Sequence, residues 1–159
     1  MSVSVVMTCH NEDGMIEQAV RSVEAQTAFE DILEIIVVND GSRDGSELVL
    51  ERLAGAIEKL RLIETPGLGQ SAARNRALRE ARGEFIAILD GDDFWTPEKL
   101  ERQLPAFARS GRIGLVYGDF VDFSRDDASV RRVVTGKIDE VAVDEADAFA
   151  ARERGKLAL

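Results

Sequence analysis

The sequence predicts an α/β fold in three layers, with a mainly parallel central sheet and helices on both of its faces. Short apolar runs alternate along the chain with segments whose apolar residues recur every three or four positions, the spacing of an amphipathic helix. In the runs over residues 35–38 and 85–89, hydrophobic residues follow one another without a polar residue between them, as in strands that are buried on both faces of a parallel sheet. This strand–helix–strand order requires crossover connections, which place helices over both faces.

Five apolar runs predict the strands of this sheet. They cover residues 3–7, 35–38, 60–63, 85–89 and 113–117. Each is bounded by glycine or polar residues, and each has the length of an ordinary strand. Beyond them, residues 118–123 alternate like an edge strand, Asp126 and Asp127 indicate a turn, and residues 130–134 are expected to return as the hairpin partner.

Four helices are expected between these strands, and a polar fifth helix near the end of the chain. The predicted ranges are residues 14–26, 48–53, 71–81, a fourth helix from Thr96 to about Arg109, and 143–154. Asp44 with Glu47 three residues later predicts a capping pair before the second helix. Thr96 and Pro97 are expected to cap the fourth, because proline is favoured in the first helical turn.

Composition and charge restrict the class of protein. The 159 residues, 45% hydrophobic and 31% charged, fit one globular domain with a substantial core. We expect a cytoplasmic protein without a transmembrane segment, because no apolar run approaches roughly 20 residues and no basic signal segment stands at the N-terminus. A formal net charge of −10 argues against nucleic-acid polymers and anionic membrane surfaces as ligands. The single cysteine, Cys9, is expected to be a buried thiol.

Three carboxylates directly follow the strand predicted over residues 85–89. Asp90, Asp92 and Asp93 fall within four positions. Two unit charges ~4 Å apart repel by about 4 kcal/mol at an effective dielectric of about 20, so a cation is expected nearby. Mg²⁺ or Mn²⁺, held by one or two carboxylates and completed by substrate phosphates, meets this need. The alternative is a solvated acidic turn before the next helix.

Polar clusters also follow two other predicted strands. Since the carboxyl ends of parallel strands meet at one edge of a sheet, these side chains should gather at a crevice of the kind that binds nucleotides. The clusters are Thr8, His10, Asn11 and Glu12 after the first strand, Asn39 and Asp40 after the second, and Asp90 and Asp92 after the fourth.

Four segments, in this order, resemble the nucleotide-sugar-binding half of family 2 glycosyltransferases, which have the Rossmann-like GT-A fold. They are residues 5–12, 37–42, 67–75 and 89–93, and the resemblance covers roughly residues 2 to 121. It implies an inverting transfer of a sugar from a nucleoside-diphosphate sugar, usually UDP-linked, with Mg²⁺ or Mn²⁺. The acceptor implied is a saccharide or a lipid-linked saccharide of unknown identity.

The resemblance also implies roles for residues at the nucleotide base. Thr8, His10 and Glu12 would line the nucleotide pocket, with His10 where the family often has an aromatic residue that stacks on the base. Val38 and Asp40, both in the second motif, would also belong to the nucleotide-binding residues, and Asp40 would accept a hydrogen bond from the ring, which is usually uracil.

Further roles are implied at the phosphates and the metal. Arg74 would approach the nucleotide or its phosphates, Asp90 would bind the ribose, and Gly91 would leave room for close approach of the ligand. Asp92 would hold the metal, as the second acid of the family's D-x-D motif. The family's base is commonly a carboxylate in a Glu-Asp pair, and no such pair follows Asp92.

Because no Glu-Asp pair follows Asp92, the sequence does not decide whether the chain contains an acceptor-binding half. We expect residues 1–123 to form the nucleotide-sugar-binding core, and residues 124–159 to be an extension of it or a truncated acceptor half. The catalytic base is not assigned. A noncatalytic nucleotide-sugar-binding module is therefore the main alternative, and partners could hold the protein at the inner membrane face.

Two other enzyme classes share single motifs with the chain. Residues 67–72 match the G-x-G-x-x-A fingerprint of NAD-dependent dehydrogenases, with Asp90 at a suitable distance. The fingerprint follows the third predicted strand rather than the first, which argues against that class. A phosphatase using Asp90 as nucleophile and Asp92 as acid is disfavoured, because Asp93 stands after the second acid where such an enzyme is expected to have threonine or valine.

Overall fold

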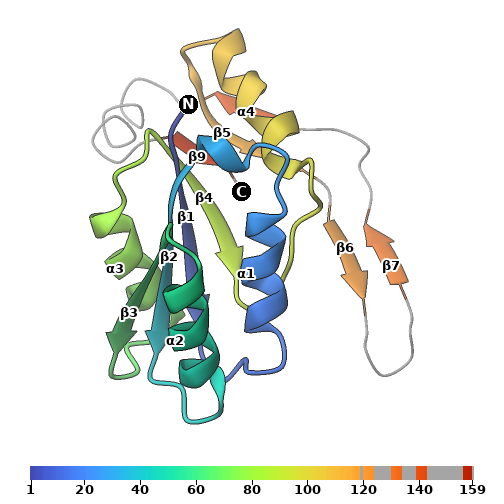
Figure 1. Ribbon diagram of the computed structural model, residues 1–159. Helices are drawn as coiled ribbons and strands as arrows, with labels where there is room; N and C mark the ends of the chain where they lie inside the picture. Colours follow the sequence, from blue (N-terminus) through green and yellow to red (C-terminus); the bar gives the residue numbers. More distant parts are fainter. Residues whose placement is uncertain (119, 124–129, 134–138, 143–155, 159) are drawn as a thin grey trace.

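The computed structural model describes residues 1–118, 120–123, 130–133, 139–142 and 156–158 (Figure 1). The turn predicted at Asp126 and Asp127 and the helix predicted over residues 143–154 lie outside the described residues.

Seven strands form one sheet in the order β3-β2-β1-β4-β9-β5-β8. They are β1 (Val3–Cys9), β2 (Ile32–Asp40), β3 (Leu60–Thr65), β4 (Phe85–Asp90), β5 (Ile113–Tyr117), β8 (Asp139–Ala142) and β9 (Lys156–Ala158). All neighbours are parallel except β5 and β8. The mainly parallel sheet is thereby confirmed, although β9, which no sequence pattern predicted, lies between β4 and β5.

A separate two-stranded sheet confirms the predicted hairpin. Strands β6 (Phe120–Phe123) and β7 (Val130–Val133) pair in antiparallel fashion, with Phe120 opposite Val133. Figure 1 shows this pair beside the main sheet, beyond α1 and α4.

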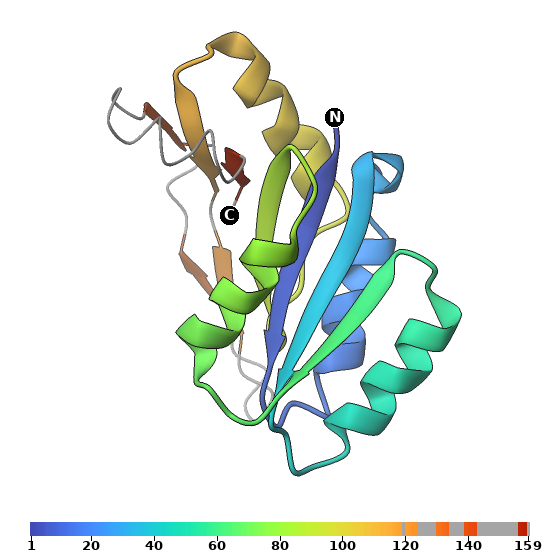
Figure 2. The ribbon, with the colours of Figure 1, turned by 90° about the vertical axis from the view of Figure 1, so that its left-hand side faces the viewer.

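Helices cover both faces of the main sheet, as predicted. They are α1 (Ile16–Glu24), α2 (Ser46–Ala56), α3 (Gln70–Glu80) and α4 (Lys99–Arg109), with a short 3₁₀ turn at Phe29–Asp31. Figure 2 shows α3 on one side of the sheet and α1 and α2 on the other. Among the described residues, none of the helices combines the length and apolar character that crossing a lipid bilayer requires.

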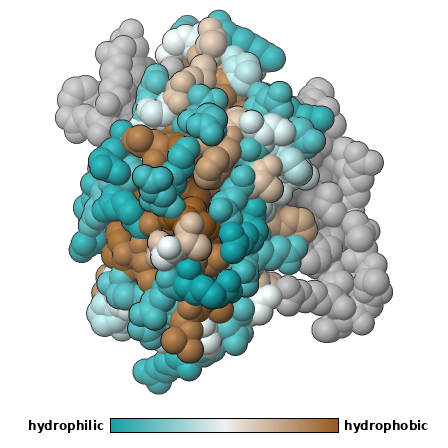
Figure 3. Space-filling view, in the orientation of Figure 1, coloured by the Kyte–Doolittle hydropathy of each residue, from teal (hydrophilic) through white to brown (hydrophobic). Residues whose placement is uncertain are grey.

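Strand alternation divides the apolar core between the two faces. Val5 and Met7 of β1 pack with α1, α2 and α4, whereas Val6 packs with β2 and α3. Because both faces of the sheet are covered, the central strands β2 and β4 contain continuous apolar runs, from which they were predicted. The surface over α1 and α2 is mostly hydrophilic, with apolar residues visible between the helices (Figure 3).

Two predicted helix starts were wrong. Helix α2 begins at Ser46 with Gly45 at the N-cap position, and the Asp44 carboxylate accepts the Ser46 N–H at 2.9 Å without capping the helix itself. Helix α4 begins at Lys99, because residues from Thr96 onward first make a turn in which Thr96 O accepts the Lys99 N–H. In both places a polar turn precedes the helix, and sequence pattern does not separate a turn from a cap.

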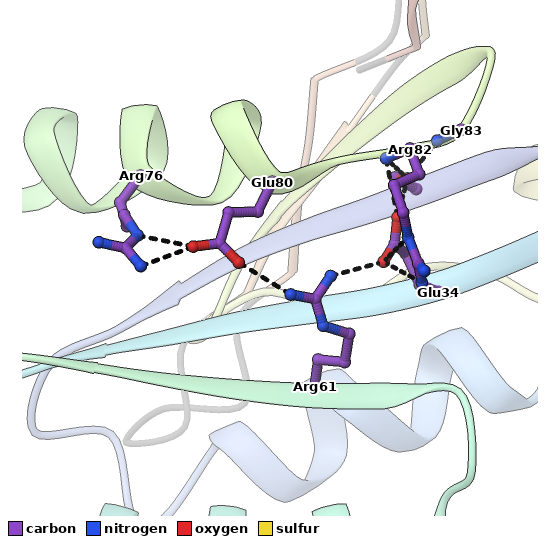
Figure 4. A network of polar contacts seen from close by, with 7 residues as sticks. Glu34, Arg61, Arg76, Glu80, Arg82 and Gly83 are labelled. Carbon is purple, nitrogen blue, oxygen red and sulfur yellow. Dashed lines mark hydrogen bonds and ion pairs between the residues drawn. The ribbon is translucent and has the colours of Figure 1, made fainter.

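A buried carboxylate ties together the amino-terminal edge of the sheet (Figure 4). Glu34 of β2 is 1% exposed, and both of its oxygens are hydrogen-bonded. Oε1 accepts from Ser4 Oγ and from the Arg82 backbone at 2.8 Å each, and Oε2 accepts from the guanidinium groups of Arg61 and Arg82 at 2.9 Å each. Arg61 also contacts Glu80, so the network joins β1, β2, β3 and α3.

This environment sets the charge state of Glu34. Burial alone would raise its pKa, but the hydrogen bonds from Arg82, Ser4 and Arg61 outweigh burial and lower the pKa to about 2. Since the pKa is lower in the folded state, the stabilisation is complete above the ordinary glutamate pKa of about 4.3 and is lost as the pH falls toward 2.

We predict that Glu34→Ala lowers the free energy of unfolding by about 3 kcal/mol at pH 7, because the hydrogen bonds from Ser4, Arg61 and Arg82 that hold the ionised carboxylate are lost. Urea denaturation measures the change. The difference between variant and wild type should shrink as the pH falls from about 4.3 toward 2. The exposed Glu58→Ala variant is the control, and a pH-independent difference for Glu34→Ala would contradict the assignment.

Candidate functional site

Parallel pairing brings the predicted polar clusters to one edge of the sheet. Thr8 of β1 lies opposite Val38 of β2 on one side and opposite Asp90 of β4 on the other. Asp40 ends β2 opposite Thr65 of β3. The strands β1 to β4 run in the same direction, so these residues share the lower edge in Figure 1.

A cavity of about 410 Å³ lies at this edge. It is lined by Thr8, Cys9, His10, Glu12, Asp40, Gly67, Gly69 and Gln70. Four of these were predicted to bind the nucleotide. Gly67, Gly69 and Gln70 were not assigned a role, although they belong to the motif over residues 67–75 that contributed Arg74.

Val38 and Cys9 lie deeper than the other candidates. Val38 is fully buried in the core against α3 and is not among the residues that line the cavity. Cys9 lines the cavity but is 1% exposed, and burial raises the pKa of its thiol to about 11. Cys9 is therefore a protonated, buried thiol, as its sequence position predicted.

Asp40 holds the loop that forms one wall of the cavity. Its Oδ1 accepts from Thr65 Oγ1 and from the Leu68 N–H at 2.6 Å each, and its Oδ2 accepts from the Gly69 N–H at 2.7 Å. Burial would raise the pKa of Asp40, but these hydrogen bonds lower it, so the group is a carboxylate. A carboxylate oxygen accepts two hydrogen bonds, which leaves Oδ2 one lone pair beside the cavity.

The turns after β2 and β3 are in direct contact. Gly41, with a φ of 69°, packs against the loop so closely that a Cβ there would lie 2.8 Å from the Gly67 backbone nitrogen. Gly67 and Gly69 also have positive φ values, of 89° and 88°. Only glycine combines these backbone conformations with this contact at low cost.

Glu12 is an incompletely satisfied carboxyl group in the cavity wall. Its Oε2 is buried without a hydrogen-bond partner, and it lies where a Cβ of Gly91 would otherwise be. Burial raises the pKa of Glu12 to about 7, the His10 backbone N–H opposes this, and the charges of Asp92 and Asp90 add to the rise. Glu12 therefore holds a proton more readily than an ordinary glutamate does.

The remaining acids gather beside Arg74 at the end of β4. The Asp90 Oδ1 forms an ion pair with Arg74 Nη2 and lies 3.5 Å from Thr8 Oγ1. Asp92 is exposed, and the pKa of Asp93 is raised by burial and by the charges of Asp92 and Asp90. Arg74 Nε is buried without a partner. The group therefore carries negative charge that one guanidinium does not balance.

The donor set fits a hard divalent cation bound together with phosphates. Asp90 and Asp92 offer carboxylate oxygens, the ligands that Mg²⁺ and Mn²⁺ prefer. Within the part of the chain that the structure describes, no three His, Cys, Asp or Glu side chains converge into a complete metal cage. Asp92 with one further carboxylate would therefore hold the ion only in part, and phosphate oxygens would complete its shell.

The family of the chain follows from comparison with known proteins. The family model described as glycosyl transferase family 2 matches residues 4–143. The chain belongs to glycosyltransferase family 2. An uncharacterized glycosyltransferase of Nostoc sp., alr2836, is 36% identical over 124 residues, which cover 77% of the chain and 38% of that protein.

Two of the similar proteins carry a name or a title that includes a UDP-linked sugar. The Escherichia coli protein called UDP-Glc:alpha-D-GlcNAc-diphosphoundecaprenol beta-1,3-glucosyltransferase WfgD is 34% identical over 118 residues, covering 74% of the chain and 45% of that protein. The crystal structure of S. aureus TarS 1-349 in complex with UDP-GlcNAc matches with a TM-score of 0.65 at 25% identity, covering 81% of the chain and 37% of that structure. The chain spans between 29% and 53% of the length of three curated relatives.

Membership of family 2, with the GT-A fold, removes the dehydrogenase and phosphatase alternatives. The geometry agrees, because the glycine-rich loop over residues 67–69 follows β3, an edge strand, rather than a central one. Its N–H groups at Leu68 and Gly69 donate to Asp40, whereas a dinucleotide fingerprint uses such groups for pyrophosphate.

We predict that Gly91→Ala lowers the stability of this family 2 domain by about 1–3 kcal/mol, because the added methyl group would overlap Glu12 Oε2 and would lie 2.9 Å from Thr8 O. Thermal unfolding measures the effect. Gly111→Ala is the matched control, since a Cβ at Gly111 meets nothing within 4 Å. Equal melting temperatures for both variants would show that Glu12 and Gly91 are not packed together.

Proposed function

We propose that the chain binds the sugar donor of an inverting family 2 glycosyltransferase, a UDP-linked sugar, with Mg²⁺ or Mn²⁺. The observation that carries the proposal is that one edge of the sheet holds both a cavity lined by the ionised Asp40 and, next to Thr8 of the cavity wall, the strand end that bears Asp90. The acids after β4 do not themselves line this cavity. The names of WfgD and of the UDP-GlcNAc complex of TarS support the choice of donor. The sugar is a hexose on this proposal, and the acceptor is a saccharide or a lipid-linked saccharide.

The nucleotide base would occupy the end of the cavity near Asp40. The free lone pair on Asp40 Oδ2 suits the ring N–H of a uracil, and the hydrogen bonds from the loop keep the carboxylate ionised and oriented. Thr8, His10 and Glu12 would complete this part of the pocket, since they line the same cavity.

The diphosphate would lie toward Asp90, Asp92 and Arg74. Departure of the nucleoside diphosphate places negative charge on its terminal phosphate, and a metal stabilises such charge as a Lewis acid. Asp92 would be the principal metal ligand and Asp90 would bind the ribose. Arg74, which pairs with Asp90 in this structure, would offer its guanidinium to the phosphates.

A second candidate is donor binding without transfer. Inverting transfer needs a base for the acceptor hydroxyl, typically worth 10²- to 10⁴-fold in rate. No Glu-Asp pair follows Asp92 in the sequence, and the chain spans only 29% to 53% of the length of three curated relatives. A catalytic base supplied by another segment or partner would distinguish a transferase from a binding module.

We predict that Asp92→Ala removes the Mn²⁺-dependent part of UDP binding while the melting temperature stays unchanged, because Asp92 is exposed and contributes little to the core. Calorimetric titration with UDP, with and without Mn²⁺, measures this. Asp31→Ala, at the opposite edge of the sheet, is the control. A variant at position 92 that retains the full Mn²⁺ effect would exclude Asp92 as the metal ligand.

We predict that Asp40→Ala weakens UDP binding by about ten- to a hundredfold, because a charge-assisted hydrogen bond of roughly 1.5 to 3 kcal/mol is lost. The loop over residues 66–69 also loses its anchor in this variant. Thr65→Val is the matched control, since it removes one hydrogen bond to Asp40 but keeps the carboxylate. If Thr65→Val weakens binding as much as Asp40→Ala does, the carboxylate acts on the loop and does not contact uracil.

A further inference from the structure

The ring of His10 has both nitrogens engaged by the protein. His10 is exposed and lines the cavity, yet its Nδ1 lies 2.7 Å from Asp40 O and its Nε2 lies 3.0 Å from Asn11 Nδ2. A backbone carbonyl only accepts hydrogen bonds, so Nδ1 must carry a proton. The Asp40 backbone therefore selects one tautomer of the imidazole.

The orientation of Asn11 is fixed independently and agrees with this tautomer. Its Oδ1 accepts the Arg43 N–H at 2.8 Å, so the atom that faces His10 is the amide nitrogen, which can only donate. His10 Nε2 must then accept. The ring is therefore neutral, with its proton on Nδ1.

The backbone of Asn11 supports the same arrangement. Asn11 has a φ of 59° and is the one non-glycine residue with positive φ among those that the structure describes. Asparagine tolerates this conformation better than most residues do. Its N–H donates to Ser42 Oγ at 3.0 Å, so the turn after β1 is attached to the turn after β2. Asn11 is thus held through its backbone N–H as well as through both polar atoms of its side chain.

Two occupied nitrogens restrict what His10 can do for a ligand. The ring has no free donor or acceptor with which to bind a ligand, to transfer a proton or to coordinate a metal. What remains for a ligand is the aromatic ring itself, and base stacking on aromatic side chains is worth about tenfold or more in affinity.

We propose that Asn11 is a positioning residue for the nucleotide base: with Asp40 O, it locks His10 in the neutral Nδ1–H tautomer, so that His10 meets the base with its ring face. This inference rests on the proposed function, because it takes the ligand to be a nucleotide. It assigns His10 the stacking surface that a tyrosine or phenylalanine would supply, and it makes the asparagine next to it the residue that orients this surface.

The tautomer can be measured without any ligand. His10 is the only histidine in the 159-residue sequence, so its ring resonances are unambiguous in a ¹⁵N NMR spectrum of this chain. We expect a protonated Nδ1 and an unprotonated Nε2 at neutral pH. A proton on Nε2, or a rapidly averaged mixture of the two tautomers, would overturn the lock whatever the protein binds.

A double-mutant cycle tests whether Asn11 acts through His10. UDP affinity in the presence of Mn²⁺ is measured for wild type, His10→Phe, Asn11→Gly and the double variant. His10→Phe should bind within about twofold of wild type and His10→Ala about tenfold more weakly. Asn11→Gly, which keeps the positive φ, should weaken binding about two- to tenfold in the wild type and have no effect in the His10→Phe background.

The outcomes separate this inference from the proposed function. An equal loss for Asn11→Gly in both backgrounds would show that Asn11 does not act through His10. A tenfold loss for His10→Phe would show that a nitrogen, and not the ring face, contacts the ligand. Absence of UDP binding by the wild type would instead contradict the proposed function and the stacking role together, while the NMR result would still decide the tautomer lock. Thermal unfolding of each variant confirms that it is folded.

Discussion

The structure depends on one constraint, the parallel pairing of β1 with β2 on one side and with β4 on the other. This register places Thr8 next to Val38 and Asp90, so the carboxyl ends of three strands lie side by side at one edge of the sheet. The apolar strand residues hold the register, because a shift by one residue would exchange the core faces of β1. The polar residues beyond each strand end therefore meet without any attraction of their own, and they repel where carboxylates gather.

Much of the fold could be predicted because its signals are local. The strands and helices of residues 1–117 follow from apolar periodicity, and the crossovers follow from their order. Strand β9 could not be predicted, since three residues, Lys156–Ala158, carry no pattern and owe their place to pairing with β4 and β5. Helix starts were misplaced because Asp44 and Thr96 make turns that resemble caps in sequence.

The candidate site likewise has a part that could be predicted from the sequence and a part that could not. Strand-end chemistry predicted that Thr8, His10, Glu12 and Asp40 would share a cavity wall, and they do. Contacts that depend on how closely two segments approach each other could not be predicted from the sequence. Examples are the position of Glu12 in the space beside Gly91 and the hydrogen bonds from the Leu68 and Gly69 N–H groups to Asp40. Val38 was predicted to bind the nucleotide only because it belongs to the same motif as Asp40, whereas the alternation of side chains along β2 turns it into the core. The ligand roles of these residues stay predictions.

The contact between Gly41 and Gly67 has a consequence for motion. Because the turn after β2 leaves no space against the loop after β3, and because the Asp40 side chain holds the Leu68 and Gly69 amides, neither segment can open while the other stays closed. The two form one cooperative unit of local unfolding. Their amide protons should then exchange with solvent at a common rate, and a ligand that contacts only one of the turns would slow exchange in both.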